Sequence, residues 1–249
     1  MSSTVQEFQC EGFCIERSLA TSEECVRMAS LARDALTPLV GPVEFEVDAG
    51  YPGAPNDRND KGGETPRRLL NAYERGVEFR SWASDPRVSE TLKCVMGRDD
   101  VLLSHCHHNC IMTKHPGYSS DTMWHQDIRY WSFDRPDLIS VWLALSDETI
   151  ENGALQVIPG SHRLEVDQGR LDRDLFLRPH MGVNMDLIET AVPIELSAGD
   201  VLFFHSRLFH AAGCNNTRNL KLSLVFTYHD SDNHPVPGTR SGEHPSYAL

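Results

Sequence analysis

Positive charge is scarce in this sequence. Lys and Arg number 23 against 36 Asp and Glu, which gives a formal net charge of -13 over 249 residues. A nucleic-acid surface needs clustered Lys and Arg, so we expect no nucleic-acid partner. Long hydrophobic runs are missing too. No apolar stretch approaches the roughly 18 residues that a membrane-spanning helix needs, and we expect no membrane partner.

The cysteines lack any paired pattern. There are seven, irregularly spaced, and no two of them form a Cys-x-x-Cys motif. A chain of this length buries a sizeable core without disulfides, so we expect reduced thiols and a cytoplasmic location. The first residues also lack the basic-then-apolar order of a secretory signal.

Linkers, internal repeats and low-complexity tracts are absent as well, which predicts a single domain over residues 1–249. Two segments stand out within it, because glycine and proline crowd residues 48–66, while residues 163–192 are polar and rich in Arg and Asp. Both are predicted to be long loops that cover a site as lids do.

The periodicity changes along the chain from helical to alternating. A capping box at Thr21 and a proline after Asp85 predict two helices in the first hundred residues. Six strands are then predicted. Period-two alternation indicates those at residues 139–145 and 220–228, and residues 101–113, 154–158, 193–196 and 201–205 are strand candidates, the last three beside turn signals. The fourth and fifth strands flank a turn and are expected to form a hairpin. This order predicts a mainly β jelly roll with flanking helices and a β core at about residues 100–230.

The densest chemistry lies in the stretch Trp124-His-Gln-Asp. On a strand, His125 and Asp127 point to the same face, and His210 follows later in the chain, just after another strand. Two histidines and one carboxylate form the facial triad of non-haem Fe(II) oxygenases. A zinc site with the same donors is the alternative, although the His-x-x-x-His spacing common in such sites is absent.

The sequence motifs around these residues resemble those of the phytanoyl-CoA dioxygenase family of Fe(II)/2-oxoglutarate-dependent oxygenases. Three stretches carry the resemblance, and they occur in the same order as in the family. They are Trp124–Trp131, Glu151–His162 with its Glu-Asn-Gly and Pro-Gly-Ser-His motifs, and Gly199–His205 followed by His210. The resemblance implies a double-stranded β-helix (a jelly-roll, cupin-like fold) with His125, Asp127 and His210 as ligands of Fe(II). It also implies that 2-oxoglutarate and O2 are co-substrates and that succinate and CO2 are released.

The resemblance further points to residues that bind 2-oxoglutarate. Trp142 aligns with a family tryptophan beside the 2-oxo acid, Cys110 lies on a strand that contacts it, and Arg68 matches a basic position near it. The family usually places an arginine eleven positions after the distal histidine, whereas this chain has Lys221 there. Arg218 is nearby but has the wrong parity for that strand face. We therefore predict that Lys221, a buried cation in need of a partner, pairs with the far carboxylate of 2-oxoglutarate.

These features predict a dioxygenase that hydroxylates an unactivated C–H of a small organic metabolite. An acidic or zwitterionic substrate would suit the arginines at positions 67, 68, 129, 163 and 173. Two alternatives stay open: a non-oxidative cupin-like hydrolase or isomerase, and a catalytically silent metal-binding homologue. His105 and His107 are also expected to share a strand face, but no further ligand completes a second metal site there.

Overall fold

The computed structural model describes residues 3–248. Its helices lie mostly in the first hundred residues, and within the described range they are α1 (Ser3–Glu11), α2 (Ser22–Asp34), α3 (Glu46–Ala49), α4 (Val77–Ala83), α5 (Pro86–Met96) and α6 (Gly182–Ile188). None of the helices in this range is long and apolar enough to cross a membrane.

The strands belong to two sheets. They are β1 (Phe13–Glu16), β2 (Val43–Phe45), β3 (Pro66–Leu70), β4 (Val101–Leu103), β5 (Asn109–Lys114), β6 (Thr122–His125), β7 (Leu138–Ala144), β8 (Leu155–Val157), β9 (Val192–Pro193), β10 (Val201–His205), β11 (His210–Ala212), β12 (Lys221–Asp230) and β13 (Tyr247–Ala248).

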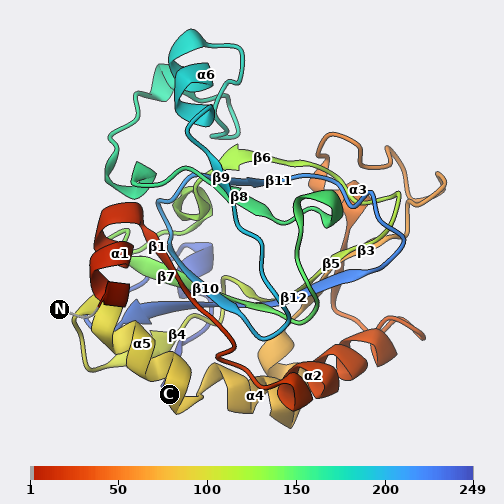
Figure 1. Cartoon of the computed structure of the whole chain (residues 1–249), viewed down its shortest axis with the longest axis horizontal. Helices are drawn as coiled ribbons and strands as arrows, with labels where there is room; N and C mark the ends of the chain where they lie inside the picture. Colours follow the sequence, from red (N-terminus) through yellow and green to blue (C-terminus); the bar gives the residue numbers. More distant parts are fainter. Residues whose placement is uncertain (1–2, 249) are drawn as a thin grey trace.

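The two sheets face each other and form a double-stranded β-helix. Across the described residues, the larger sheet has nine strands, with β1-β10-β7-β12-β5-β3-β2 in order and β4 and β13 attached beyond β12. The smaller sheet has four, in the order β6-β11-β8-β9. In Figure 1 the smaller sheet lies above the larger one, and α2, α4 and α5 line the opposite side of the larger sheet. The prediction of a mainly β jelly roll with flanking helices is confirmed.

The central strand β12 shows why the alternating pattern at residues 220–228 matters. Leu222, Leu224 and Phe226 pack with the helices in one buried cluster, whereas Val225 packs between the two sheets. Lys221 and Ser223 share the face of Val225, so two polar side chains point into the space between the sheets. Because both faces of β12 are covered, all ten of its residues are buried.

The helix signals behave as the sequence predicts. Thr21 forms the predicted capping box with Glu24 before α2, and Asp85 caps α5 with Pro86 in its first turn. Gly97 ends α5 with a left-handed backbone, at φ 64°. Local capping therefore sets where both helices begin, and their buried faces then pack in the core.

Two strand predictions are wrong. Residues 101–113 do not form one strand, because residues 104–108 bend between β4 and β5. The expected hairpin between residues 193–196 and 201–205 does not form either. β9 pairs with β8 in the smaller sheet, whereas β10 pairs with β1 and β7 in the larger one. The short turn at residues 198–200 thus carries the chain from one sheet to the other, which a local pattern does not distinguish from a hairpin.

The two segments expected to be lids approach each other over the open end of the roll. Tyr51, from the first, makes an edge-to-face contact with Phe176, from the second, with ring centroids 5.5 Å apart. Phe176 in turn packs edge-on against His125 at 5.8 Å. The second segment also contains the short helix α6, which stands away from both sheets in Figure 1. That these segments act as lids stays a prediction.

Candidate metal centre

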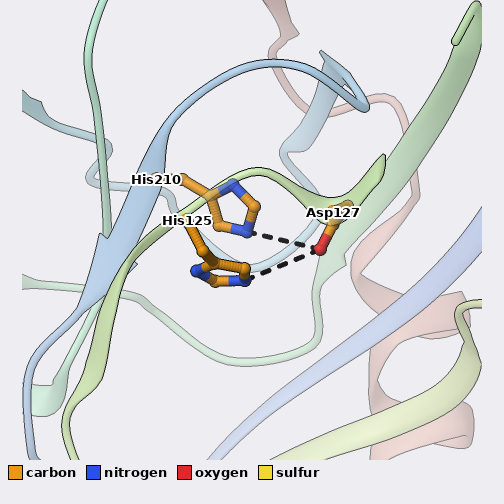
Figure 2. A group of neighbouring side chains, drawn as sticks. All are labelled: His125, Asp127 and His210. Atoms are coloured by element: carbon orange, nitrogen blue, oxygen red, sulfur yellow. Dashed lines mark ion pairs between the residues drawn. The ribbon is translucent and has the colours of Figure 1, made fainter. Parts of the chain in front are cut away.

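Two neighbouring strands of the smaller sheet bring the predicted ligands together. His125 at the end of β6 lies directly opposite His210 at the start of β11. The Nε2 atoms of both rings point at Asp127 Oδ1, at 3.7 Å from His125 and 3.6 Å from His210 (Figure 2). All three side chains are almost fully buried, with exposed fractions of 7% or less.

The parity argument for Asp127 is wrong in detail although its conclusion holds. β6 ends at His125, and Asp127 opens a short 3-10 turn (Asp127–Tyr130) instead of continuing the strand. The chain therefore turns the carboxylate back towards the histidines. A strand would have carried it past them.

Backbone carbonyls fix which ring nitrogens are free. His125 Nδ1 lies 2.8 Å from Met123 O, and His210 Nδ1 lies 3.0 Å from Leu208 O. A carbonyl accepts only from an N–H, so each Nδ1 carries the proton and each Nε2 keeps its lone pair for a metal. Both ligand histidines are thus oriented by the residue two positions before them in the sequence.

Electrostatics keep His125 and Asp127 in the ionisation states that a metal needs. Burial lowers the pKa of His125 well below its usual range, with a further contribution from neighbouring His210, so its imidazole is neutral. Burial by itself would raise the pKa of Asp127, but the imidazoles of His108, His210 and His125 hold it below its ordinary value. The Ser140 hydroxyl also donates to Asp127 Oδ2 at 3.4 Å. The result is an ionised carboxylate beside the neutral imidazole of His125.

These residues fit a divalent metal ion. Their ligand atoms lie within 4.8 Å of one another. A metal about 2 Å from each atom would hold neighbouring donors about 3 Å apart, so only small side-chain movements are required. Two nitrogens and one oxygen on a single face leave the remaining coordination positions for other ligands.

Two cavities meet at this centre, and both include Arg67, Arg68, His108, His125 and Asp127 in their walls. The first, which we call the inner pocket, runs between the sheets and is completed by Met112, Lys114, Trp142, Leu155, Lys221 and others. The second, which we call the outer cavity, has a volume of about 370 Å³ and is completed by Glu44, Tyr51, His107, Asn109, Trp131, Arg240 and others. The centre thus separates two binding spaces of different composition.

Lys221 points into the inner pocket as predicted, but it does not lack a partner. Its Nζ lies 2.8 Å from Oε2 of Glu148, and the two side chains are 3% and 1% exposed. The other oxygen of Glu148 accepts from Trp142 Nε1 at 2.8 Å and from the Ser223 hydroxyl at 2.6 Å. The premise that this lysine is unpaired is therefore wrong. Glu148 lies in a loop 73 positions away, where no local signal connects it to Lys221.

Lys114 is a pocket residue that the sequence reasoning missed. It stands directly opposite Lys221 across β5 and β12, and its Nζ donates to the backbone carbonyls of Ser120, at 3.0 Å, and Gly213. Burial, then Lys221 and Arg67, lower the pKa of Lys114 to about 8. Within residues 3–248 it forms no salt bridge with a carboxylate; its Nζ is bound by carbonyl oxygens, and Glu46 acts on its charge without pairing with it.

A glycine of the Glu-Asn-Gly stretch makes room for this lysine. Gly153 has φ 80°, and a Cβ there would lie 2.4 Å from Gly213 O and 2.9 Å from Cδ of Lys114. Any side chain would therefore collide with the carbonyl that Lys114 binds. Alternation along β5 was the available signal for Lys114, because Cys110, Met112 and Lys114 share one face.

The other predicted co-substrate residues divide between the two cavities. Trp142 lines the inner pocket, Cys110 lines the outer cavity, and Arg68 lines both. Burial raises the pKa of Cys110 to about 11, so its thiol stays protonated near neutral pH. The structure thus puts Trp142 and Lys221 together at the far end of the inner pocket and separates Cys110 from them.

The arginines and the neighbouring histidines are also placed. Arg67 is buried and hydrogen-bonds Glu46, Ser120 and Thr122, whereas Arg163, Arg173 and Arg218 are exposed. His107 stacks on Trp131 at 4.9 Å, and its Nε2 lies 2.8 Å from the Ser241 hydroxyl. His105 stacks on Tyr247. These two histidines lie in the bend at residues 104–108, so the expectation that they share a strand face is wrong.

A buried His-Asp-His set at the open end of a double-stranded β-helix defines the class of protein: a metal-binding β-roll with a ligand pocket between its sheets. The family model of phytanoyl-CoA dioxygenase (PhyH) matches residues 8–222. The chain belongs to this family.

Curated relatives match over part of their length. A probable phytanoyl-CoA dioxygenase of Caenorhabditis elegans is 27% identical over 69% of this chain and 57% of its own. The peroxisomal phytanoyl-CoA dioxygenase of Homo sapiens is 26% identical over 66% of this chain and 49% of its own. The chain thus spans about half the length of the curated relatives that it matches.

Solved structures share the fold at low identity. EctD from S. alaskensis, described with 2-oxoglutarate and 5-hydroxyectoine, superposes with a TM-score of 0.76 at 19% identity, over 98% of this chain and 82% of that one. The epimerase SnoN, described in complex with Fe3+, alpha ketoglutarate and nogalamycin RO, gives 0.74 at 20% identity, over 96% and 86%. At these identities the likeness establishes the architecture.

Proposed function

We propose that the protein is a non-haem iron, 2-oxoglutarate-dependent dioxygenase that hydroxylates an unactivated C–H of a small organic metabolite. In this reaction a C–H compound, 2-oxoglutarate and O2 give the alcohol, succinate and CO2: one oxygen atom of O2 goes to the alcohol and the other to succinate, while CO2 leaves from the carboxylate next to the keto group. The observation that carries the proposal is the meeting of two buried imidazoles and one carboxylate between two ligand cavities.

The residues of this chain have separable roles in that reaction. His125, Asp127 and His210 would hold Fe(II), which when bound supplies the oxidative chemistry that no side chain here offers. The inner pocket would take 2-oxoglutarate, with Trp142 against it and the ammoniums of Lys114 and Lys221 near its far carboxylate. Lys114 suits that role because a ligand carboxylate would supply the salt-bridge partner that it lacks. Cys110 and Arg68 would border the co-substrate from the outer cavity.

The outer cavity would bind the substrate, and its walls favour a polar molecule, acidic or zwitterionic. Groups of both signs line it, among them Glu44 and Asp48 against Arg68 and Arg240. Two buried atoms in its wall, Asn109 Nδ2 and His107 Nδ1, have no hydrogen-bond partner within residues 3–248. A polar ligand would satisfy them, because buried polar groups are costly when unpaired. At about 370 Å³, this polar space suits a small metabolite better than a long acyl chain.

We also place the protein in the cytoplasm. All seven of its cysteines are free. Burial raises the pKa of Cys25 to about 11, which leaves this thiol protonated and slow to oxidise. Free thiols are typical of proteins in reducing compartments. Fractionation of the native host, followed by immunoblotting, tests this placement.

Aerobic incubation with Fe(II), 2-oxoglutarate and small polar metabolites tests the enzymatic proposal. We expect succinate release and a product heavier by about 16 mass units, the mass of one oxygen. The matched control is His210→Ala, which removes one ligand and leaves the lining of the outer cavity unchanged. Turnover of a substrate without succinate release or O2 consumption would favour the hydrolase or isomerase. Metal binding with no affinity for 2-oxoglutarate would favour the silent homologue. Succinate release without a gain in product mass would support the use of Fe(II) and 2-oxoglutarate but replace hydroxylation by another reaction. One structural neighbour, for example, is described as an epimerase.

A further inference from the structure

A carboxylate of the protein itself, that of Glu148, lies directly behind two residues at the far end of the inner pocket. Glu148 is fully buried, and both of its oxygens are engaged: Oε2 by the Lys221 ammonium, and Oε1 by Trp142 Nε1 and the Ser223 hydroxyl. Lys221 and Trp142 line the pocket, so Glu148 reaches the ligand space through them. We call Glu148, Lys221, Trp142 and Ser223 the Glu148 cluster.

The backbone holds Glu148 firmly in this position. Its N–H donates to Leu196 O at 2.7 Å, and its carbonyl accepts from Leu196 N at 3.0 Å. This bridge ties the loop after β7 to the segment that leads into β10. Glu148 is therefore anchored at its main chain as well as at its carboxylate, and it cannot swing away from Lys221 without breaking several hydrogen bonds.

The formal charges at this end of the pocket do not cancel. Lys114 and Lys221 face each other across adjacent strands and bring two positive charges, while Glu148 brings one negative charge next to Lys221. Arg67 and Glu46 also line the pocket, but they pair with each other and their charges cancel. One formal positive charge is left, on the Lys114 side. A far carboxylate arriving from a dicarboxylic 2-oxo acid would neutralise it, but it would approach a lysine that Glu148 already occupies.

We propose that Glu148 is a specificity-determining residue, an internal carboxylate that competes with the far carboxylate of the co-substrate for Lys221 and so limits the preference of the pocket for 2-oxo dicarboxylic acids. This inference rests on the proposed use of 2-oxoglutarate. Its physical basis is that two like charges beside one ammonium repel each other, and that a buried site screens this repulsion weakly. The glutamate thus sets the affinity for 2-oxoglutarate without touching the metal.

Calorimetric titration of the Fe(II)-loaded protein without O2 tests the proposal with two ligands of equal chain length. 2-Oxoglutarate carries the far carboxylate, and 2-oxopentanoate ends in a methyl group instead. In Glu148→Gln, which keeps the shape and removes the charge, we expect 2-oxoglutarate to bind about tenfold tighter. The affinity for 2-oxopentanoate should change less than about twofold, since that ligand places no charge near Lys221. Glu151→Gln, an exposed change of the same charge nearby, is the matched control and should alter neither affinity.

The double variant Glu148→Gln/Lys221→Met keeps the test decisive if the single change disturbs folding. It replaces the buried pair by two uncharged side chains of similar size, a kind of exchange that folded proteins often tolerate. Because Glu148 already offsets Lys221 in the parent, we expect the double variant to bind 2-oxoglutarate within about threefold of the parent. Lys221→Met by itself should bind far more weakly, because it leaves Glu148 unpaired.

Three results would overturn the proposal. Equal changes for both ligands in Glu148→Gln would make Glu148 a purely structural residue. Weaker binding of 2-oxoglutarate in that variant would mean that the glutamate helps the co-substrate to bind. A double variant as weak as Lys221→Met would show that Lys221 acts independently of Glu148. Failure of the proposed function would look different: the parent protein itself would bind metal but not 2-oxoglutarate. In the three results above, by contrast, the parent still binds 2-oxoglutarate.

Discussion

The two ends of the inner pocket are built in opposite ways. At the metal end, each ligand histidine is held by a carbonyl two residues before it, and two of the three ligands lie within three consecutive residues. At the far end, the Glu148 cluster joins β7, β12 and the loop that follows β7. One end depends on local geometry, and the other on the meeting of distant segments.

The comparison teaches how each end tolerates change. A metal centre is defined by its donor atoms, so loss of one donor removes the function outright. The far end is defined by a sum of charges, so its substitutions change an affinity by amounts that depend on the neighbours. We therefore expect substitutions at the metal end to have the largest effect on metal and co-substrate binding. Substitutions at the far end should have smaller effects, and those outside the inner pocket the smallest.

Loss of a ligand should have the largest effect. Asp127→Ala removes the only carboxylate of the triad, and we expect it to abolish metal retention and the metal-dependent turnover of 2-oxoglutarate. Elemental analysis after gel filtration and a succinate assay measure the two quantities. Asp137→Ala, at a side chain that is 60% exposed, is the control. Full turnover in Asp127→Ala would show that the metal centre is wrongly assigned.

Removal of the pocket lysine should come next. Lys221→Ala deletes a cation and leaves Glu148 buried without its ion-pair partner, facing the incoming carboxylate. We expect 2-oxoglutarate binding to weaken by about 2–4 kcal/mol, the usual scale for truncating one member of a buried charge pair. Metal content should stay the same, because Lys221 is not a ligand. Lys93→Ala, on the exposed face of α5, is the control. An unchanged affinity for 2-oxoglutarate in calorimetry would show that Lys221 has a structural role in the sheet and does not bind the co-substrate.

The opposite lysine should produce a smaller, pH-dependent effect. Burial lowers the pKa of Lys114 to about 8 from an ordinary 10.5, so the free protein loses this ammonium as the pH rises through about 8. A carboxylate binds the protonated form, and its affinity should therefore fall above pH 8, by at most about tenfold per pH unit. Lys114→Gln should weaken binding at pH 7 by about tenfold and flatten the profile. An equally steep profile in the variant would assign the titration to another group.

Changes in the outer cavity, away from the inner pocket, should have the smallest effect on metal binding. The double change His105→Gln/His107→Gln alters two side chains that stack on aromatic rings and supply no triad atom. We expect metal content to stay at about one per chain, the number for a single triad. Two metals in the parent and one in the variant, by elemental analysis, would reveal a second site and remove the contrast between the pocket and its surroundings.

Sequence reasoning reached the metal end because its signals are local. The Trp124-His-Gln-Asp stretch identified two ligands, although Asp127 reaches the centre through a turn and not along a strand. It reached the far end only in part. Lys221 was found by its spacing from His210, whereas Lys114 was missed despite sharing a strand face with Cys110 and Met112. Glu148 carried no signal at all, because a loop residue shows neither parity nor period.

The sequence by itself determined the two capped helices, the alternating strand at residues 220–228, the class of fold and the identity of the three candidate ligands. The helices, the strand and the pair His125 and Asp127 depend on patterns within a few residues, whereas the fold class and His210 depend on the order of motifs that the chain shares with its family. Only the tertiary structure decided which strands pair within each sheet. It puts β9 in the smaller sheet and β10 in the larger one, although they are neighbours in the sequence. It alone placed Glu148 beside Lys221, because a buried charge finds its partner through the packing of segments that lie far apart in the chain.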